Sequence, residues 1–186
     1  GRYAHQAEIM TFRFHSIGHS TRTPEEVIDM LQFAGVQLLI DVRSFPKSRR
    51  YPAFNDNQFP QTLATYQIGY QHMLALGGRR PKQKEVDDDL NANWRVRSFQ
   101  NYADYALGDA FQTAFAELID LGRTKIVAMM CSEAVWWRCH RRIITDYLLL
   151  HGHSVGHIMS AKKITKATPS EAAELRPDGT VVYPPL

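Results

Sequence analysis

Two patterns of hydrophobic positions alternate along most of the chain. Short apolar runs of strand length occur five times, at residues 12–17, 36–42, 70–76, 125–130 and 155–159. Apolar residues at helical spacing follow them, in segments that begin near residues 24, 56, 99, 110 and 139. Strands that alternate with helices predict a parallel sheet with right-handed crossovers. We therefore expect a three-layer α/β/α (Rossmann-like) fold with a mostly parallel sheet of about five strands.

The first helix has the most clearly marked boundaries. Thr23 can serve as its N-cap, Pro24 suits the first helical position, and Glu26 completes a capping box. Gly35 stands where this helix would end. Together these residues predict a helix that packs one apolar face on the sheet.

The remaining boundaries are less regular. Asn55 or Asp56 is expected to cap the second helix. Residues 79–97 are polar without a period, which predicts an irregular segment. A short helix is expected at 170–175 and a turn at 177–179.

One domain is expected from a chain of 186 residues. Residues 1–11 are interpreted as an extension, 12–160 as the α/β domain, and 161–186 as an appendage packed on it. No apolar run approaches the roughly 20 residues of a membrane span, so no membrane association is expected. Two cysteines cannot form a disulfide framework, which favours a reducing cytoplasm.

The basic residues are unevenly divided between the two types. Arginine supplies 15 of the 22 basic residues, although the formal net charge is only +3. Arginine is preferred where a planar fork must hold carboxylate or phosphate. Several arginines fall in expected loops, which favours an anionic partner.

The strand ends locate the candidate site. Ligands of open α/β sheets bind outside the carboxyl ends of the strands. The residues that follow the expected strands should therefore share one edge of the sheet; they are His19 and Ser20, Asp41 to Ser44, Gly77 to Arg80, and Cys131 to Glu133.

The segment 131–141 carries the most unusual chemistry. Cys139 lies at or near a helix start beside His140 and Arg141, where a thiol pKa is expected to be lowered. Three interpretations stay open: Cys139 is a nucleophile, the two cysteines and His140 bind a metal, or they only pack. Metal-ligand spacing is missing, so no metal is assigned.

A family resemblance rests on motifs that occur in order along residues 12–160. They are Ile17-Gly18-His19-Ser20, Asp41-Val42-Arg43-Ser44 with Pro46 and Ser48-Arg49-Arg50, Phe54-Asn55, Leu76-Gly77-Gly78-Arg79, Tyr102-Ala103-Asp104-Tyr105, Met130-Cys131-Ser132-Glu133, Trp137-Arg138-Cys139-His140-Arg141 and His157-Ile158. The chain resembles the domain of unknown function 488 family. The resemblance implies a small α/β domain with a Rossmann-like arrangement, and it implies no established reaction.

The expected function is an enzyme of hydrolase or glycosyl-transfer type that acts on a phosphate-bearing small molecule, a nucleotide or a nucleic acid. The expected catalytic residues are His19, Asp41, Glu133, Cys139 and His140. The expected substrate-binding residues are Ser20, Arg43, Ser48, Arg49, Gly78, Arg79, Trp137, Arg138 and Arg141. No recognised motif requires a cofactor. Two alternatives remain: a non-catalytic nucleic-acid-binding module, and a thiol or sulfur-transfer enzyme that uses Cys139 or Cys131.

Overall fold

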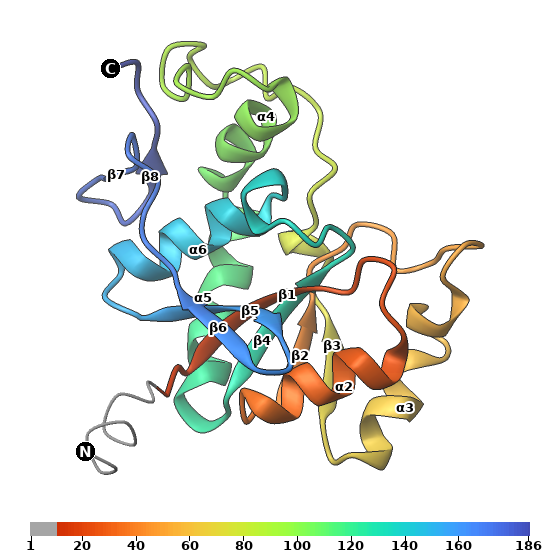
Figure 1. The fold of residues 1–186 in the computed structure, drawn as a ribbon. Coiled ribbons are helices and arrows are strands. Elements are labelled where there is room, and N and C mark those ends of the chain that lie inside the picture. Colours follow the sequence, from red (N-terminus) through yellow and green to blue (C-terminus); the bar gives the residue numbers. More distant parts are fainter. Residues whose placement is uncertain (1–10) are drawn as a thin grey trace, which may run out of the picture.

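The computed structural model describes residues 11–186 (Figure 1). The strands are β1 (Phe14–Gly18), β2 (Leu38–Asp41), β3 (Gly69–His72), β4 (Val127–Cys131), β5 (Val155–Ser160), β6 (Lys163–Lys166), β7 (Glu174–Leu175) and β8 (Val181–Val182). The α-helices are α2 (Pro24–Phe33), α3 (Phe59–Thr65), α4 (Arg97–Ala106), α5 (Asp109–Thr124) and α6 (Arg141–Leu150). Short 3₁₀ turns cover Pro52–Phe54, Leu74–Leu76 and Trp136–Arg138.

The main sheet has the strand order β3-β2-β4-β1-β5-β6. Strands β1 to β5 pair in parallel, which confirms the predicted fold class. Strand β6 pairs antiparallel with β5 at one edge and was not expected from the sequence. The carboxyl ends of β1, β2 and β4 meet side by side in the middle of the sheet.

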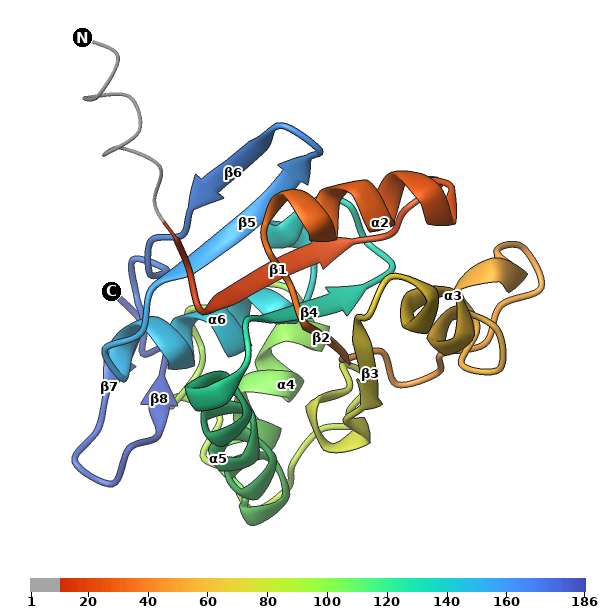
Figure 2. The same ribbon diagram turned by 90° about the horizontal axis from the view of Figure 1, so that it is seen from below.

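Helices cover both faces of the sheet (Figure 2). Alternate residues of β2 point to opposite faces of the sheet. Leu38 and Ile40 pack with α4, α5 and α6, whereas Leu39 packs with α2 and α3. Both faces of these short strands are therefore apolar, as expected for a parallel sheet covered on each side.

The first helix forms as the sequence predicts. Thr23 Oγ1 accepts a hydrogen bond from the Glu26 backbone N–H, and the Glu26 carboxylate accepts one from the Thr23 N–H. Gly35, just beyond the helix end, has φ +72°, a conformation that glycine adopts without steric cost. The reciprocal cap and the closing glycine are thus confirmed.

Two local predictions are wrong. No side chain caps α3: the Asn55 amide instead pairs with the backbone of Ser48, and Gln58 occupies the cap position. The expected helix at 170–175 is a turn followed by β7, because Glu174–Leu175 pair with Val181–Val182. That hairpin reverses at Gly179, with φ +89°, in the expected turn.

The C-terminal segment packs on α6 and on the segment that precedes α4 through buried polar contacts. The Tyr183 backbone N–H donates to Asn91 Oδ1, and the Tyr183 hydroxyl donates to Asp146 Oδ2. Among residues 11–186, no helix has the length and apolarity needed to span a bilayer. Residues 1–10, assigned to the expected extension, lie outside the described residues.

Candidate active site: an arginine-rimmed cavity over two thiols

A cavity of about 510 Å³ opens at the carboxyl ends of the central strands. Nine residues predicted for the site line it: His19, Arg43, Ser48, Gly78, Arg79, Glu133, Arg138, Cys139 and His140. An adjoining hollow of about 230 Å³ is lined by Ser20 and shares the walls His19, Tyr51, Ser132 and Glu133. The structure therefore brings together segments separated by more than a hundred residues.

Other predicted residues lie outside this lining. Asp41 and Arg141 are buried behind it, at 0% and 2% exposure. Arg49 is exposed beside it, and Trp137 packs edge-on against Trp136 with 47% of its surface exposed. Ser44 and Ser132, which the sequence analysis placed at this edge without a role, also line the cavity. The sequence analysis missed several other lining residues, mainly of the loop after β2: Phe45, Lys47, Arg50, Tyr51, Ser98 and Phe99. A pattern of apolar and polar positions carries no signal for such loop residues.

The cavity wall contains both cysteines of the chain. Cys131 ends β4, and Cys139 precedes α6; both are free thiols, and their Sγ atoms lie 2.7 Å apart. The loop that connects them passes around the cavity through Ser132, Glu133 and Arg138. The sheet edge and the start of α6 therefore hold two thiols in direct contact.

Arg141 is the charged group that lies under these thiols. Its guanidinium donates to Cys131 Sγ, to Ser16 Oγ and to the carbonyl oxygens of Glu133 and Ala134. No carboxylate of the described residues lies within ion-pair distance of it. A buried guanidinium needs a nearby negative charge. The acidic groups in contact with it are the two thiols, which can supply this negative charge when one of them ionises.

The two thiols differ in acidity. Burial opposes ionisation of Cys139, but its hydrogen bond with Cys131 and the positive charge of Arg141 outweigh burial and lower the pKa of this thiol to about 7. Burial and the neighbouring Cys139 raise the pKa of Cys131 well above its ordinary value. Cys139 is therefore the more acidic of the two thiols and the one that ionises first.

His140 presents an unprotonated nitrogen to Cys139. Its Nε2 lies 2.7 Å from the carbonyl oxygen of Val42, which can only accept, so Nε2 carries the proton. Its Nδ1 lies 3.5 Å from Cys139 Sγ and is free to accept a proton. Burial lowers the pKa of His140, which keeps the ring neutral. Gly78 packs flat on this imidazole, where any Cβ would collide with Nδ1 and Cγ.

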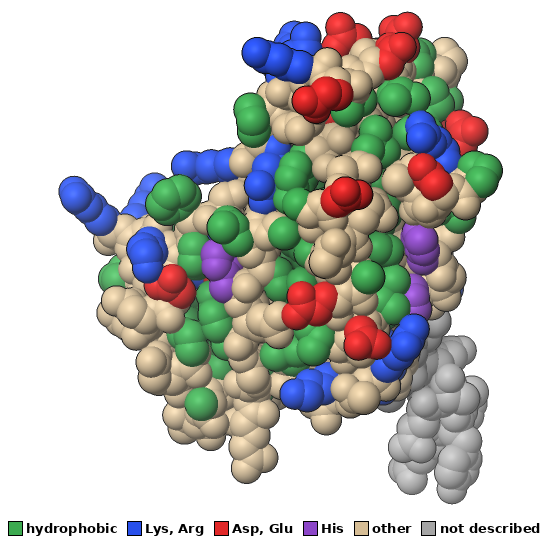
Figure 3. All heavy atoms as spheres, turned by 180° about the vertical axis from the view of Figure 1, so that it is seen from behind, with side chains coloured by type: hydrophobic (Ala, Val, Ile, Leu, Met, Phe, Trp, Pro, Cys, Tyr) green, Lys and Arg blue, Asp and Glu red, His purple; other side chains and the backbone are tan. Residues whose placement is uncertain are grey.

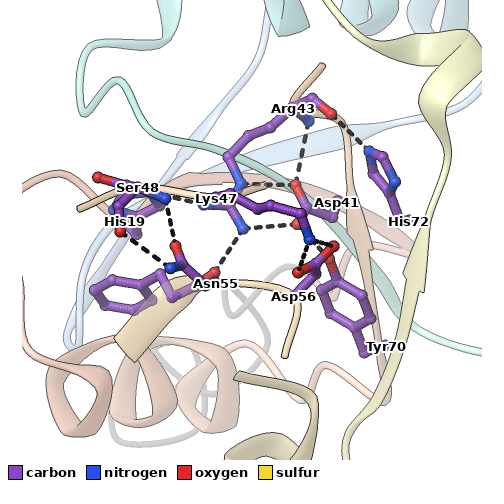
Figure 4. Close-up of polar contacts among 10 residues, drawn as sticks. His19, Asp41, Arg43, Lys47, Ser48, Asn55, Asp56, Tyr70 and His72 are labelled. Carbon is purple, nitrogen blue, oxygen red and sulfur yellow. Dashed lines mark hydrogen bonds and ion pairs between the residues drawn. The ribbon is translucent and has the colours of Figure 1, made fainter. Parts of the chain in front are cut away.

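Asp41 forms a buried ion pair with Arg43 (Figure 4). Arg43 donates to both carboxylate oxygens, at 2.9 and 2.7 Å, and the Tyr70 hydroxyl donates to Oδ2. The same guanidinium donates to the carbonyl oxygen of Phe54 at 2.7 Å. With its oxygens engaged behind the cavity, Asp41 holds Arg43 in place and has no free position for proton transfer to a ligand.

His19 is held in a similar way. Its Nδ1 donates to the Ser20 carbonyl oxygen at 2.9 Å, and its Nε2 lies 3.3 Å from Arg43 Nη1 and accepts from it. Burial lowers the pKa of His19 to about 4, so the ring is neutral at pH 7. Its face stacks on Phe54 at 4.4 Å. These contacts make His19 a wall of the cavity that fixes Arg43.

The mouth of the cavity is rich in positively charged side chains. Arg50, Arg79 and Arg138 come from three different segments and line it, and Glu133 is its one carboxylate among the described residues. Arg79 lies over the ring of Phe45, which is 69% exposed. Figure 3 shows Lys and Arg side chains projecting from the left margin, the side that carries the orange loop in Figure 1. This arrangement suits an anion, held by guanidinium groups over the thiols.

Behind Arg141 lies a buried polar pair that links β1 and β5. Ser16 Oγ accepts from Arg141 Nε at 3.2 Å and lies 2.6 Å from His157 Nδ1. His157 is 1% exposed, stacks on Trp136 at 4.3 Å, and has no hydrogen-bond partner at Nε2. The strand alternation at residues 12–17 placed Ser16 only as a strand residue, so its contact with Arg141 was not predicted.

Replacement of Ser16 by alanine tests this buried contact. The Ser16→Ala variant should lose about 1–3 kcal/mol of unfolding free energy, because it leaves Arg141 Nε and His157 Nδ1 unpaired. Urea unfolding measures the loss. Ser160→Ala, at the exposed end of β5, is the matched control and should change stability by less than about 0.5 kcal/mol. Equal effects of the two substitutions would contradict the importance of the contact.

Comparisons with known proteins identify one match. The family model described as Domain of unknown function DUF488 matches residues 23–148. No curated protein and no solved structure matches the chain. The matched region contains Arg43, Gly78, both thiols and Arg141, so the cavity wall is built largely from it.

Proposed function

This chain belongs to the family described as Domain of unknown function DUF488, and for it we propose a thiol-dependent enzyme whose Cys139 thiolate attacks an anionic, phosphate-bearing small molecule. One observation carries the proposal: two thiols in contact, with buried Arg141 beneath them, line an arginine-rimmed cavity. A thiolate is the nucleophilic form of cysteine, and a neighbouring cation favours it.

The contacts favour thiol chemistry over the carboxylate chemistry expected from the sequence. Asp41 is held by Arg43 and Tyr70, and the Glu133 carboxylate accepts from the Val135 N–H on the exposed rim. Cys139 instead has a potential base, His140 Nδ1, within 3.5 Å. A cysteine nucleophile beside a neutral imidazole is the combination best suited to covalent catalysis here.

The cavity size favours a small molecule over a nucleic-acid strand. A volume of about 510 Å³ lies in the range of small-molecule sites, roughly 300–1,000 Å³. Arg50, Arg79 and Arg138 would hold its phosphate group. A reducing compartment such as the cytoplasm would keep both thiols available.

The alkylation rate with iodoacetamide, followed against pH, tests the nucleophile. Wild-type protein should be alkylated at Cys139, with a rate that rises through a midpoint near pH 7, since the rate follows the thiolate fraction. Mass mapping should place the label on Cys139. Cys131→Ser should still be alkylated, and Cys139→Ser should react only slowly below pH 8. A midpoint near the ordinary value of roughly 8.5, or equal labelling of both thiols, would refute the proposal.

Protection by inorganic phosphate tests the anion site. Phosphate should slow alkylation of Cys139 relative to chloride at equal ionic strength, because an anion held by the rim covers the thiols. The double variant Arg79→Ala/Arg138→Ala should abolish protection. Arg123→Ala, which removes an exposed arginine from the far end of α5, is the control and should keep it. Protection unchanged in the double variant would remove the rim arginines from the site.

A further inference from the structure

Resting on the proposed function, we infer that Cys139 and Cys131 form a redox pair that reduces anionic organic disulfides, with Cys139 as attacking and Cys131 as resolving thiol. Transfer of a group through a single covalent adduct requires one thiol only. The structure holds a second thiol with its Sγ 2.7 Å from the first, on the wall of the same cavity. Any adduct formed on Cys139 is therefore within reach of Cys131.

The pair can close with little movement. A disulfide has an S–S distance of about 2.05 Å, so the two Sγ atoms need to approach by less than an ångström. They stand at the ends of one loop, residues 131–139, of which Ser132, Glu133 and Arg138 are exposed and line the cavity. Closure therefore needs only this small approach of the two sulfur atoms.

The exchange balances in two steps. The Cys139 thiolate attacks one sulfur of the substrate; its S–S bond breaks, and one organic thiolate leaves. Cys131 then attacks Cys139 Sγ, the mixed disulfide breaks, and the Cys131 proton ends on the second organic thiolate. The protein dithiol loses two electrons, which reduce the substrate disulfide to a thiol and a thiolate.

Arg141 makes the resulting disulfide easy to reduce again. In the reduced pair, the thiolate provides the counter-charge of this buried guanidinium. In the disulfide that charge is gone, and Arg141 is left buried without a partner of opposite charge, which is unfavourable. Stabilisation of the reduced form makes a disulfide oxidising and labile, as in catalytic pairs.

The rim selects the charge of the substrate. Arg79 and Arg138 attract anions, and Phe45, Phe99 and Tyr51 offer apolar contact to an organic group. An organic disulfide with phosphate or carboxylate groups combines both features.

The chromogenic, anionic disulfide 5,5′-dithiobis(2-nitrobenzoate) tests the inference. At pH 7, wild-type protein should release two equivalents of nitrothiobenzoate from one equivalent of reagent and end two hydrogen atoms lighter by mass spectrometry. Cys131→Ser should release one equivalent and keep the adduct on Cys139. Reduced glutathione should return the oxidised wild type to two free thiols. An adduct retained by the wild-type protein would overturn the inference and leave the proposed nucleophile standing.

A comparison of an anionic with a neutral disulfide reagent tests whether the arginines of the rim, and not only the closeness of the two thiols, determine the reaction rate. The Arg79→Ala/Arg138→Ala variant should react about tenfold more slowly with the anionic reagent at low salt, and at an unchanged rate with neutral 2,2′-dithiodipyridine. Arg123→Ala should change neither rate. Equal slowing with both reagents would overturn the selection for anionic disulfides. If neither thiol of the wild type reacts at pH 7, the proposed function fails together with the inference.

Discussion

Replacement of Arg141 by methionine should slow alkylation of Cys139 at pH 7 by at least about tenfold, because the thiolate loses the cation that stabilises it. Methionine fills much of the space of the arginine stem without its charge. The pKa of Cys139 should move upward, toward or above its ordinary value, since burial then acts unopposed by Arg141. The midpoint of the rate–pH profile measures this shift directly.

Arg142 supplies a matched control for that substitution. It is the next residue of α6, but its guanidinium donates to Ser170 Oγ, lies over the rings of Trp94 and Trp136, and makes no hydrogen bond to either thiol. Arg142→Met should leave both the rate and its midpoint near the wild-type values. An unchanged profile in Arg141→Met, with circular dichroism showing a folded protein, would mean that the thiolate is stabilised by some other group.

Asp41→Asn should destabilise the protein by about 3–5 kcal/mol, the usual cost of breaking a buried ion pair from one side. Asp41 is completely buried, and Arg43 is 8% exposed. The variant leaves the Arg43 guanidinium buried without its negative partner, and the Tyr70 hydroxyl loses a charged acceptor. Chemical denaturation should show a lower midpoint with an unchanged slope.

The exposed ion pair drawn beside it in Figure 4 is the control. Lys47 Nζ lies 2.9 Å from Asp56 Oδ1, but the lysine side chain is 65% exposed. Asp56→Asn should therefore cost no more than about 1 kcal/mol. An equally small loss of unfolding free energy in Asp41→Asn would show that the buried Asp41–Arg43 pair does not stabilise the protein.

Local signals predicted the fold where neighbours in sequence supply the interactions. The α2 cap was predictable because Thr23 and Glu26 satisfy each other's backbone groups within one turn. The buried strands β2 and β4 were predictable because their apolar runs need cover on both faces. The structure of the segment 170–175 was not predictable in this way, because Glu174 and Leu175 form a strand only by pairing with residues 181–182.

The same distinction between local and long-range interactions applies to the candidate site. The location of His19, Arg43, Cys131 and Cys139 at one sheet edge followed from strand order in the sequence, because parallel strands end on the same side. Which of these groups are reactive did not follow. Asp41 was expected to be catalytic, whereas in the structure Arg43 and Tyr70 hold its carboxylate.

The amino-acid order alone therefore specifies the α/β layers and the edge of the sheet where the cavity opens, since helix caps and apolar periods act over a few residues. The contact between two thiols and a buried guanidinium exists only in the folded chain. Arg141 meets Ser16 across 125 positions of sequence. The charge of a thiol depends on what surrounds it in space, and that environment is assembled from β1, β4 and α6 together.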